Sequence, residues 1–327
     1  MSINSIPVYT AADWGYRGPL EVMLLSLDEN LKEGTLLQVR LLTLPDSIER
    51  FYNHVWPKFR HINIKFISLD VKVLSGIPVY GHTGIMTYVR LLLDQTDICP
   101  ESRALYLDAD ILVRGDITPL LEATKNLKTA LGAVHELGTE TVAGKGGVFN
   151  WSELGLNRND RYFNAGVLGL NLELIRQEGL FVLAKNYLLK HGRNVLAWDQ
   201  GALNAVAVGR ITFWPLTWNY TTSMLKYGAC LRAELSGREW VPDPSAALIA
   251  HFTGSGFCKP WFNNTISPFI GEYFSYAKKA GFALGLNSGL ERRLGVNCAK
   301  KVRQLHAFYL GFRVTIGQFK NSFYTVI

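Results

Sequence analysis

Two aspartates separated by a single residue, Asp108 and Asp110, come directly after the apolar run 104–107. Side chains alternate along a strand, so positions i and i+2 face the same side and we expect the two carboxylates to converge. In open α/β sheets the carboxyl ends of the strands are where ligands bind. Converging carboxylates repel each other unless a cation lies between them, and Mg²⁺ and Mn²⁺ prefer such hard oxygen ligands. The pattern predicts a divalent-metal site suited to holding a phosphate, although two solvated or turn-capping aspartates remain an open alternative.

A further carboxylate, Asp13, follows the first apolar segment and has Trp14 and Tyr16 beside it. A carboxylate at a strand end can accept a nucleobase N–H while an aromatic ring covers the face of the base. Capping of the helix that begins nearby explains Asp13 equally well. The first strand is followed by no Gly-x-Gly-x-x-Gly and the chain has no Gly-Lys-Ser/Thr loop. The sequence therefore does not predict a dinucleotide or P-loop phosphate cradle.

The elements that must position these residues alternate between strand-like and helix-like segments. The predicted strands are residues 6–10, 36–44, 62–69, 103–107, 131–134, 162–170 and 246–252. The predicted helices are residues 19–31, 85–93, 172–189 and 199–208, with another that begins at residue 45. Strands that alternate with helices of this length indicate the α/β class with a parallel, doubly wound central sheet.

The chain of 327 residues is 48% hydrophobic, which is typical of a globular protein with a substantial core. We expect one catalytic domain over residues 1–265 and a mainly helical, basic appendage over residues 266–327. No run approaches the ~18 apolar residues of a transmembrane helix, and the first residues lack the basic and apolar regions of a secretory signal. Four cysteines without metal-ligand spacing fit reduced thiols, so the predicted location is cytoplasmic.

The net charge of +7 is concentrated in residues 291–327, which carry seven basic residues and one acidic residue. Apolar and aromatic residues are interleaved with them: Leu305, Phe308, Tyr309, Leu310, Phe312, Val314, Ile316, Phe319, Phe323 and Tyr324. Anionic lipid attracts such charge while the apolar side chains enter the interface. We predict peripheral attachment of this tail to an anionic membrane and no nucleic-acid partner. A terminal helix with a solvated basic face, or polyanion binding, is the alternative.

Five blocks in order resemble glycosyltransferase family 8, the retaining transferases that include bacterial lipopolysaccharide galactosyl- and glucosyltransferases and glycogenin. The blocks are Ala11-Ala12-Asp13 with Tyr16, residues 105–113, residues 163–167, Asp199-Gln200 with Leu203-Asn204, and His251-Phe252 with Gly254 and 259–261. The resemblance runs from about residue 7 to residue 261. It implies a GT-A type nucleotide-binding fold, a UDP-sugar donor and Mn²⁺ (or Mg²⁺) as cofactor.

For the metal and the diphosphate, the resemblance implies that Asp108, Asp110 and His251 are the protein ligands of the metal. An imidazole is a reasonable ligand for Mn²⁺. Lys259 matches the lysine that neutralises the diphosphate, and Gly254 belongs to the same donor-binding block. The chain departs from the family in the longer loop between His251 and Lys259.

For the nucleoside and the sugar, the resemblance implies that Asp13 contacts uracil, with Ala11 in the same block. Arg90 matches a basic residue near the donor sugar, although an arginine in a helix is more often a structural ion pair. Asn164 and, on weaker grounds, Glu136 would line the donor or acceptor pocket.

The remaining pair, Asp199 and Gln200, matches the residues that the family places near the reacting face of the sugar. Retention of configuration requires front-side attack or two inversions through a covalent intermediate, and Asp199 is the candidate carboxylate for the latter. The sequence does not choose between these mechanisms. Both residues would also suit the start of the predicted helix 199–208.

The leading functional hypothesis is transfer of a hexose from a UDP-hexose donor to a glycan or lipid-linked saccharide acceptor. The expected process is synthesis of bacterial lipopolysaccharide or another surface polysaccharide, at the inner face of the cytoplasmic membrane. One alternative is a sugar-nucleotide pyrophosphorylase, which would need a Gly-rich basic loop where the chain has Ala11-Ala12-Asp13. Another is a non-catalytic basic protein that binds membranes or polyanions on a transferase fold.

Overall fold

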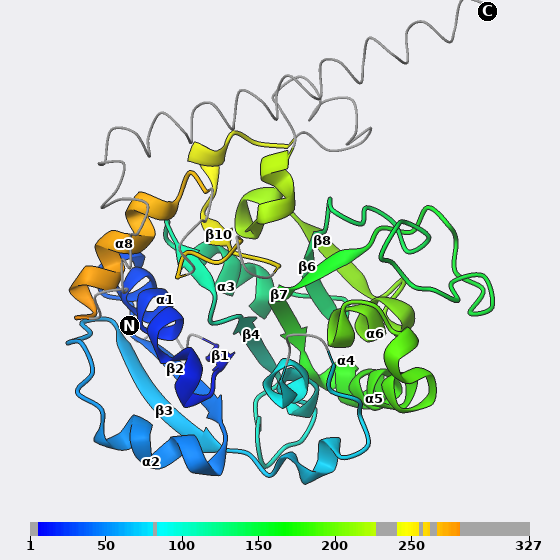
Figure 1. Ribbon diagram of the computed structural model, residues 1–327, viewed down its shortest axis with the longest axis horizontal. Helices are drawn as coiled ribbons and strands as arrows, with labels where there is room; N and C mark the ends of the chain where they lie inside the picture. The colour runs from blue at the N-terminus through cyan, green and yellow to red at the C-terminus, as the bar shows by residue number, and fades with distance from the viewer. Residues whose placement is uncertain (1–5, 81–83, 227–240, 255–257, 262–266, 282–327) are drawn as a thin grey trace, which may run out of the picture.

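A twisted seven-stranded sheet forms the centre of the described part of the chain in the computed structural model (Figure 1). The structure describes residues 6–80, 84–226, 241–254, 258–261 and 267–281. The strand order is β3-β2-β1-β4-β7-β6-β8, and only β7 runs antiparallel to its neighbours β4 and β6. The strands are β1 Val8–Ala11, β2 Leu37–Thr43, β3 Ile62–Ser68, β4 Arg103–Leu107, β6 Leu131–His135, β7 Phe163–Asn171 and β8 Ile211–Trp214. The predicted α/β class with a mostly parallel sheet is confirmed.

Helices cover both faces of this sheet. The α-helices are α1 Arg17–Asn30, α2 Pro45–Asn53, α3 Thr118–Lys125, α4 Leu172–Gln177, α5 Leu180–His191, α6 Trp198–Val206 and α8 Ile270–Lys279. The 3₁₀ helices are η1 Trp14–Tyr16, η2 Val71–Leu74, η3 Ile85–Leu92, η4 Gly192–Asn194, η5 Leu216–Trp218, η6 Thr222–Lys226 and η7 Pro244–Ala246. Figure 1 shows α1 and α8 beside each other, and α4, α5 and α6 grouped at the other end of the sheet.

Alternation along the strands divides the core into two hydrophobic clusters. In β4, Leu105 and Leu107 pack in the cluster that includes α1 and α3, whereas Ala104 and Tyr106 pack in the cluster that includes η3, α5 and α6. Because successive side chains of a strand point to opposite faces, one apolar strand supplies both clusters. This is why the strand is an uninterrupted apolar run in the sequence.

A second, three-stranded sheet of order β5-β10-β9 adjoins the large one, with β5 Ile111–Val113, β9 Tyr220–Thr221 and β10 Ile249–His251. The chain leaves the large sheet at the end of β4 and enters the small sheet at β5 only four residues later. The turn between them, residues 108–110, therefore lies at the junction of the two sheets. This junction is where the site is built.

Three predicted elements differ from the structure. The helix predicted over 85–93 is the 3₁₀ helix η3, because apolar spacing over eight residues does not separate a repeat of 3.0 from one of 3.6. The helix predicted over 172–189 is two helices, since Gly179 adopts φ 61° and ends α4. The strand predicted over 246–252 is shorter, because residues 244–246 form η7.

The predicted appendage is described only in its first part, where α8 packs against α1 and buries Tyr273. Lys279 Nζ lies 2.8 Å from Glu29 Oε1 of α1, which fastens the end of α8. The predicted membrane-binding tail, residues 291–327, lies outside the described residues. Among the residues that are described, no helix combines the length and the apolar character needed to cross a bilayer. The boundary at residue 265 stays a prediction.

Candidate active site

A cavity of about 630 Å³ opens where the carboxyl ends of β1 and β4 meet the small sheet. Every site residue predicted from the sequence lines it: Ala11, Asp13, Arg90, Asp108, Asp110, Glu136, Asn164, Asp199, Gln200, His251, Gly254 and Lys259. These residues come from segments spread over about 250 positions. The cavity is thus assembled by the tertiary fold, and what each residue contacts in a substrate stays a prediction.

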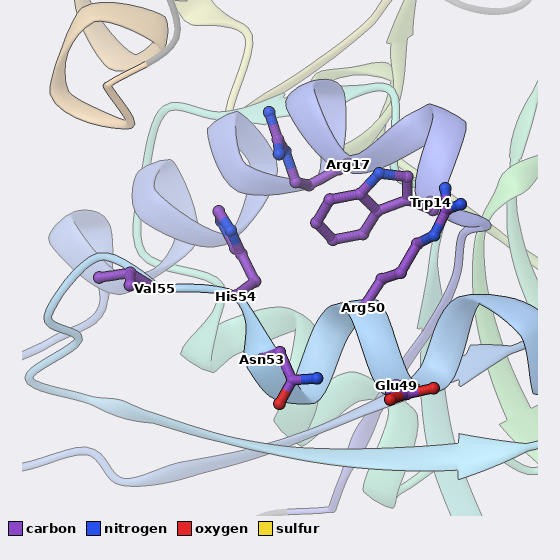
Figure 2. Close-up of a pocket in the computed structure, with 7 residues that line it drawn as sticks. All are labelled: Trp14, Arg17, Glu49, Arg50, Asn53, His54 and Val55. Carbon is purple, nitrogen blue, oxygen red and sulfur yellow. The ribbon is translucent and has the colours of Figure 1, made fainter.

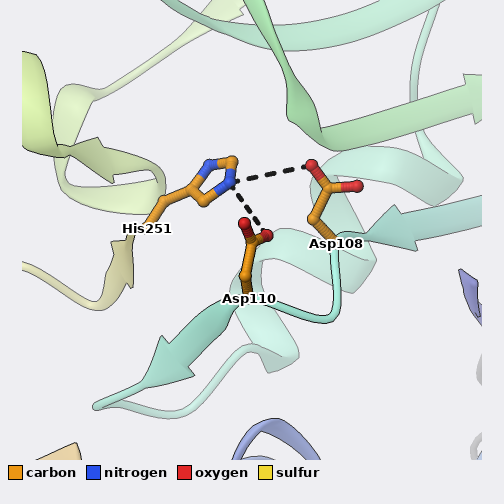
Figure 3. A group of neighbouring side chains, drawn as sticks. All are labelled: Asp108, Asp110 and His251. Atoms are coloured by element: carbon orange, nitrogen blue, oxygen red, sulfur yellow. Dashed lines mark ion pairs between the residues drawn. The ribbon is translucent and has the colours of Figure 1, made fainter. Parts of the chain in front are cut away.

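Asp108, Asp110 and His251 converge in this cavity (Figure 3). One potential ligand atom from each lies within 4.8 Å of the other two, and His251 Nε2 is 3.2 Å from Asp110 Oδ1. The two aspartates lie in the turn after β4 and not on the strand itself, so strand alternation is the wrong reason for their convergence. His251 meets them because its pairing with Ile111 in the small sheet places the end of β10 beside that turn.

The chain can approach this cluster closely only because residue 166 is glycine. A Cβ atom at Gly166 would lie 2.1 Å from His251 Cε1 and 2.7 Å from Asp108 Oδ2. The backbone O of Gly166 also accepts a hydrogen bond from Asp108 N, at 2.8 Å, as β7 continues alongside β4. Gly166 belongs to a recognised motif, but its role in making room for two side chains of the cluster is visible only in the structure.

Lys259 reaches the cluster despite the longer loop that precedes it, and its amine forms an ion pair with Asp110. The Tyr16 hydroxyl lies 3.5 Å from the same carboxylate. Burial by itself would raise the pKa of Asp110, but the positive charge of Lys259 outweighs burial and, together with the neighbouring His251, holds that pKa well below its usual range. Asp110 is therefore ionised in the site.

Arg90 is a buried cross-link between two carboxylates of the cavity. Its Nη2 lies 2.9 Å from Asp108 Oδ1 and its Nε lies 2.7 Å from Asp199 Oδ2, while its guanidinium stacks on Tyr106 with 4.6 Å to the ring centre. Burial acts to lower the pKa of Arg90, and the two aspartates raise it further than burial lowers it. The ion-pair explanation of Arg90 is thus confirmed, and the pair it forms is part of the cavity wall.

Asp199 and Gln200 lie at the start of α6, as predicted, but the approach to this helix is unusual. Ala197 and Trp198, directly before Asp199, both adopt positive φ angles of 56° and 54°. Such left-handed residues without a glycine are costly and persist where the surrounding structure requires them. Gln200 Oε1 accepts a hydrogen bond from Ala165 N at 3.0 Å, which ties the helix to β7.

Asp199 is only 2% exposed, and its burial has an electrostatic consequence. Burial raises the pKa of Asp199 to about 6, against the lowering effect of Arg90, and the charge of Asp108 adds to the rise. A carboxyl group with a pKa in this range changes its charge near neutrality.

Asp13 caps η1, since its Oδ1 accepts a hydrogen bond from Tyr16 N at 3.0 Å. The capping alternative is therefore confirmed, and Asp13 also faces the cavity, so contact with a base is compatible with it. Gly254 has φ 89°, a conformation that side chains rarely adopt, directly before the segment that leads to Lys259.

A second hollow of about 590 Å³ lies between η1, α1 and α2 and contains none of the predicted site residues (Figure 2). Figure 2 shows Trp14, Arg17, Arg50 and His54 around it. Two of its side chains share one buried carboxylate: the Nε of Arg17 lies 3.5 Å from Glu21, and His54 pairs with the same carboxylate. Burial raises the pKa of Glu21. Because the cavity at the sheet junction holds every predicted residue, the site is placed there.

Comparison with known proteins agrees with this geometry. The family described as "Glycosyl transferase family 8" matches residues 11–265. The chain belongs to glycosyltransferase family 8. This match confirms the predicted enzyme class, and it removes the support for a pyrophosphorylase.

The chain is similar in sequence to two bacterial proteins that differ in how much of their length it covers. General stress protein A of Bacillus subtilis is 26% identical over 281 residues, which are 82% of this chain and 92% of that protein. Lipopolysaccharide 1,2-glucosyltransferase of Escherichia coli K12 is 29% identical over 212 residues, 65% of this chain and 60% of that enzyme. Among solved structures, the galactosyltransferase LgtC in complex with donor and acceptor sugar analogs has a TM-score of 0.67 at 22% identity, covering 85% of this chain and 97% of LgtC. This likeness confirms the GT-A type fold.

Proposed function

We propose that this member of glycosyltransferase family 8 transfers a hexose from a UDP-sugar to a glycan acceptor, with retention of configuration and dependence on Mn²⁺. The observation that carries the proposal is the cluster of Asp108, Asp110 and His251, with the amine of Lys259 beside it in one cavity. Two hard carboxylates and one imidazole are a donor set that suits Mn²⁺ or Mg²⁺. The residues present therefore fit the metal that the family implies.

The leaving diphosphate of the donor carries the charge that must be stabilised. When bound, Mn²⁺ would supply Lewis-acid stabilisation of the two phosphates. The amine of Lys259 adds a fixed positive charge next to Asp110, where it can neutralise further negative charge as the bond to the sugar breaks. Asp13, which follows β1 and lines the cavity, would contact the base of the nucleotide.

At the other side of the cavity, Arg90 orients Asp199 through the 2.7 Å ion pair. Asp199 is the carboxylate that could stabilise positive charge on the sugar or attack it as a nucleophile. The alternative is front-side attack, in which the departing phosphate accepts the proton of the acceptor. Gln200 and Asn164 complete the wall on which the sugar would lie.

The acceptor we propose is a saccharide of a bacterial surface polysaccharide, such as lipopolysaccharide, at the inner face of the cytoplasmic membrane. The support is the presence of a lipopolysaccharide glucosyltransferase among the relatives and the concentration of basic and apolar residues in 291–327. Basic residues near an anionic membrane surface favour docking.

Thermal unfolding with UDP, with and without Mn²⁺, tests donor and metal together. A ligand present at about 100 times its Kd adds about 2.7 kcal/mol to the free energy of unfolding. We expect stabilisation by UDP to require Mn²⁺, and a screen of UDP-sugars for hydrolysis to identify the hexose. An equal effect of UDP after chelation of metal would contradict metal-dependent binding. A β-linked product from an α-UDP-sugar, seen by NMR, would contradict retention.

A further inference from the structure

Four buried side chains form a hydrogen-bonded row behind His251. His251 Nδ1 is 2.9 Å from Asn219 Oδ1, Asn219 Nδ2 donates to Asn164 Oδ1 at 2.8 Å, and Asn164 Nδ2 donates to Glu136 Oε2 at 2.9 Å. None of the four is more than 7% exposed, and Asn219 is fully buried. The row runs from the edge of the cavity into β7 and on to the end of β6. Asn219 follows η5 and carries no signal in the sequence that points to the site.

The contacts at the Asn164–Glu136 end of the row determine which atom donates and which accepts in every hydrogen bond along it. The backbone N–H of Gly166 donates to Asn164 at 2.9 Å, so the atom it meets must be the amide oxygen. The amide nitrogen of Asn164 then faces Glu136, whose carboxylate accepts further hydrogen bonds from Gly138 N and Ser223 Oγ. An ionised carboxylate only accepts, so both ends agree.

The same logic continues to the histidine. The oxygen of Asn164 can only accept, so Asn219 must present its nitrogen to Asn164 and its oxygen to His251. An oxygen facing His251 requires that Nδ1 carries the proton. In the neutral form of the imidazole the lone pair is then on Nε2, the atom that lies 3.2 Å from Asp110 and 3.7 Å from Asp108.

We propose that Asn219, Asn164 and Glu136 form a positioning relay that holds His251 in the Nδ1–H tautomer and aims its Nε2 lone pair at the space between Asp108 and Asp110. The inference rests on the proposed function in that this space is the metal site. The partner of the second ring nitrogen sets the orientation and basicity of a metal-ligating histidine, and losing that partner typically costs 10–100-fold in metal affinity. Asn219 thus acts on the metal through His251 and contacts neither substrate nor metal.

The chain offers a matched control for this relay. Asn171, at the end of β7, is another buried asparagine, and its side chain makes two hydrogen bonds, to Leu127 O and from Leu174 N, away from the relay. Asn219→Leu and Asn171→Leu both remove a buried amide of the same size. Only the first interrupts the relay, so a difference between them reports the relay and not the loss of a buried hydrogen bond.

Metal affinity is the first measurement, made by titrating Mn²⁺ in the presence of UDP and following free Mn²⁺ by electron paramagnetic resonance. We expect Asn219→Leu to weaken Mn²⁺ binding about 10–100-fold and Asn171→Leu to leave it unchanged. Glu136→Gln should weaken it less, because Gly166 N–H still orients Asn164. Asn219→Asp keeps an oxygen toward Nδ1–H but loses the donor to Asn164 Oδ1, so it should restore only part of the affinity that Asn219→Leu loses.

The tautomer itself is the second measurement, and it needs no metal. In protein with ¹⁵N-labelled histidine at about pH 9, the His251 signal is identified by its loss in His251→Gln. We expect the Nδ1–H form in the wild type and in Asn171→Leu, and a mixture of tautomers in Asn219→Leu.

The two measurements separate the relay from the proposed function. An Nε2–H tautomer in the wild type, or wild-type Mn²⁺ affinity in Asn219→Leu, would overturn the relay while leaving the transferase intact. A wild type that binds no Mn²⁺ with UDP would overturn the proposed metal site, and the tautomer experiment would still decide whether the relay exists. If Asn219→Leu does not fold, Glu136→Gln must show the smaller loss of affinity, and unchanged affinity in that variant would count against the relay.

Discussion

Asp110 is contacted by side chains from three separate segments: the amine of Lys259, the imidazole of His251 and the hydroxyl of Tyr16. Lys259 and His251 hold its carboxyl group ionised, so its negative charge is available to a cation at neutral pH. A residue with this many charged partners serves both the stability of the site and its chemistry. The two contributions are separable by experiment.

Asp110→Asn removes the charge and keeps the shape of the side chain. We expect it to abolish Mn²⁺-dependent transfer and to lower the free energy of unfolding of the metal-free protein by about 3 kcal/mol, because the largely buried amine of Lys259 loses its charged partner. Urea unfolding and turnover with and without chelator measure the two effects. Full activity of this variant in the presence of chelator would refute the metal role of Asp110.

Asp199 gives a pH dependence of defined sign. Its pKa is about 6 in the folded protein, above the ordinary 3.8, so the folded state binds its proton more tightly than the unfolded state does. This contribution to stability is complete below about pH 4 and is lost as the pH rises through about 6, and it amounts to about 3 kcal/mol from 1.36 kcal/mol per pKa unit. Between pH 4 and 7 the stability of the wild type should therefore fall relative to that of Asp199→Asn. Parallel pH profiles of the two metal-free proteins in urea unfolding would disprove the shift.

Among the elements, the contact of β6, β7 and β8 depends on two glycines that face each other across the strands. Gly132 pairs with Gly169, and a Cβ atom on either would lie 2.2 or 2.3 Å from the ring of Trp214 in β8. The large indole fills the space that the two missing side chains leave. The sequence does not show that the Trp214 ring occupies the space beside these glycines, because this depends on the pairing of three strands.

Gly169→Ala should accordingly lower the free energy of unfolding by about 1–3 kcal/mol, because the ring of Trp214 cannot yield within a packed core. In a Trp214→Leu background the same substitution should cost much less, since the atoms that clash are gone. Gly271→Ala is the control: a Cβ atom there meets nothing within 4 Å, and in the helix α8 it should stabilise by about 0.5–1 kcal/mol. Equal costs of Gly169→Ala in both backgrounds, by urea unfolding, would show that Trp214 is not the cause.

At the scale of the whole molecule, the charge is uneven, since seven basic residues lie in 291–327 and the rest of the chain is nearly neutral. Each basic residue near an anionic membrane contributes about 1 kcal/mol, so this tail would bind reversibly and less strongly as salt screens it. The interleaved aromatic residues should leave a part of the binding that salt does not remove.

Truncation after Leu290 keeps α8 and its contacts with α1. We expect the truncated protein to turn over a soluble acceptor nearly as well as the full chain but to lose co-sedimentation with anionic liposomes. A tail that only covers the domain would behave differently, because its removal would expose core and lower stability. Equal pelleting of the full and truncated chains would rule out membrane attachment through this tail.

From the sequence alone, the α/β class and the individual chemistry-bearing residues follow, because both are local. The alternation of apolar segments sets the order of strands and helices, and Asp108 and Asp110 are informative because they directly follow one apolar strand. The predicted residues do line one cavity. Local periodicity also has limits, which explains why η3 was expected as an α-helix and why Gly179 was missed as the end of α4.

Only the tertiary structure decides which of these residues meet, because the pairing of distant strands leaves no trace in local periodicity. His251 reaches Asp110 through the pairing of β10 with β5, across about 140 residues of chain. The pair of Arg90 with Asp199 and the row behind His251 arise in the same way. Asn219, an ordinary asparagine in the sequence, becomes the partner of His251 because the fold buries it where only a hydrogen bond satisfies its amide.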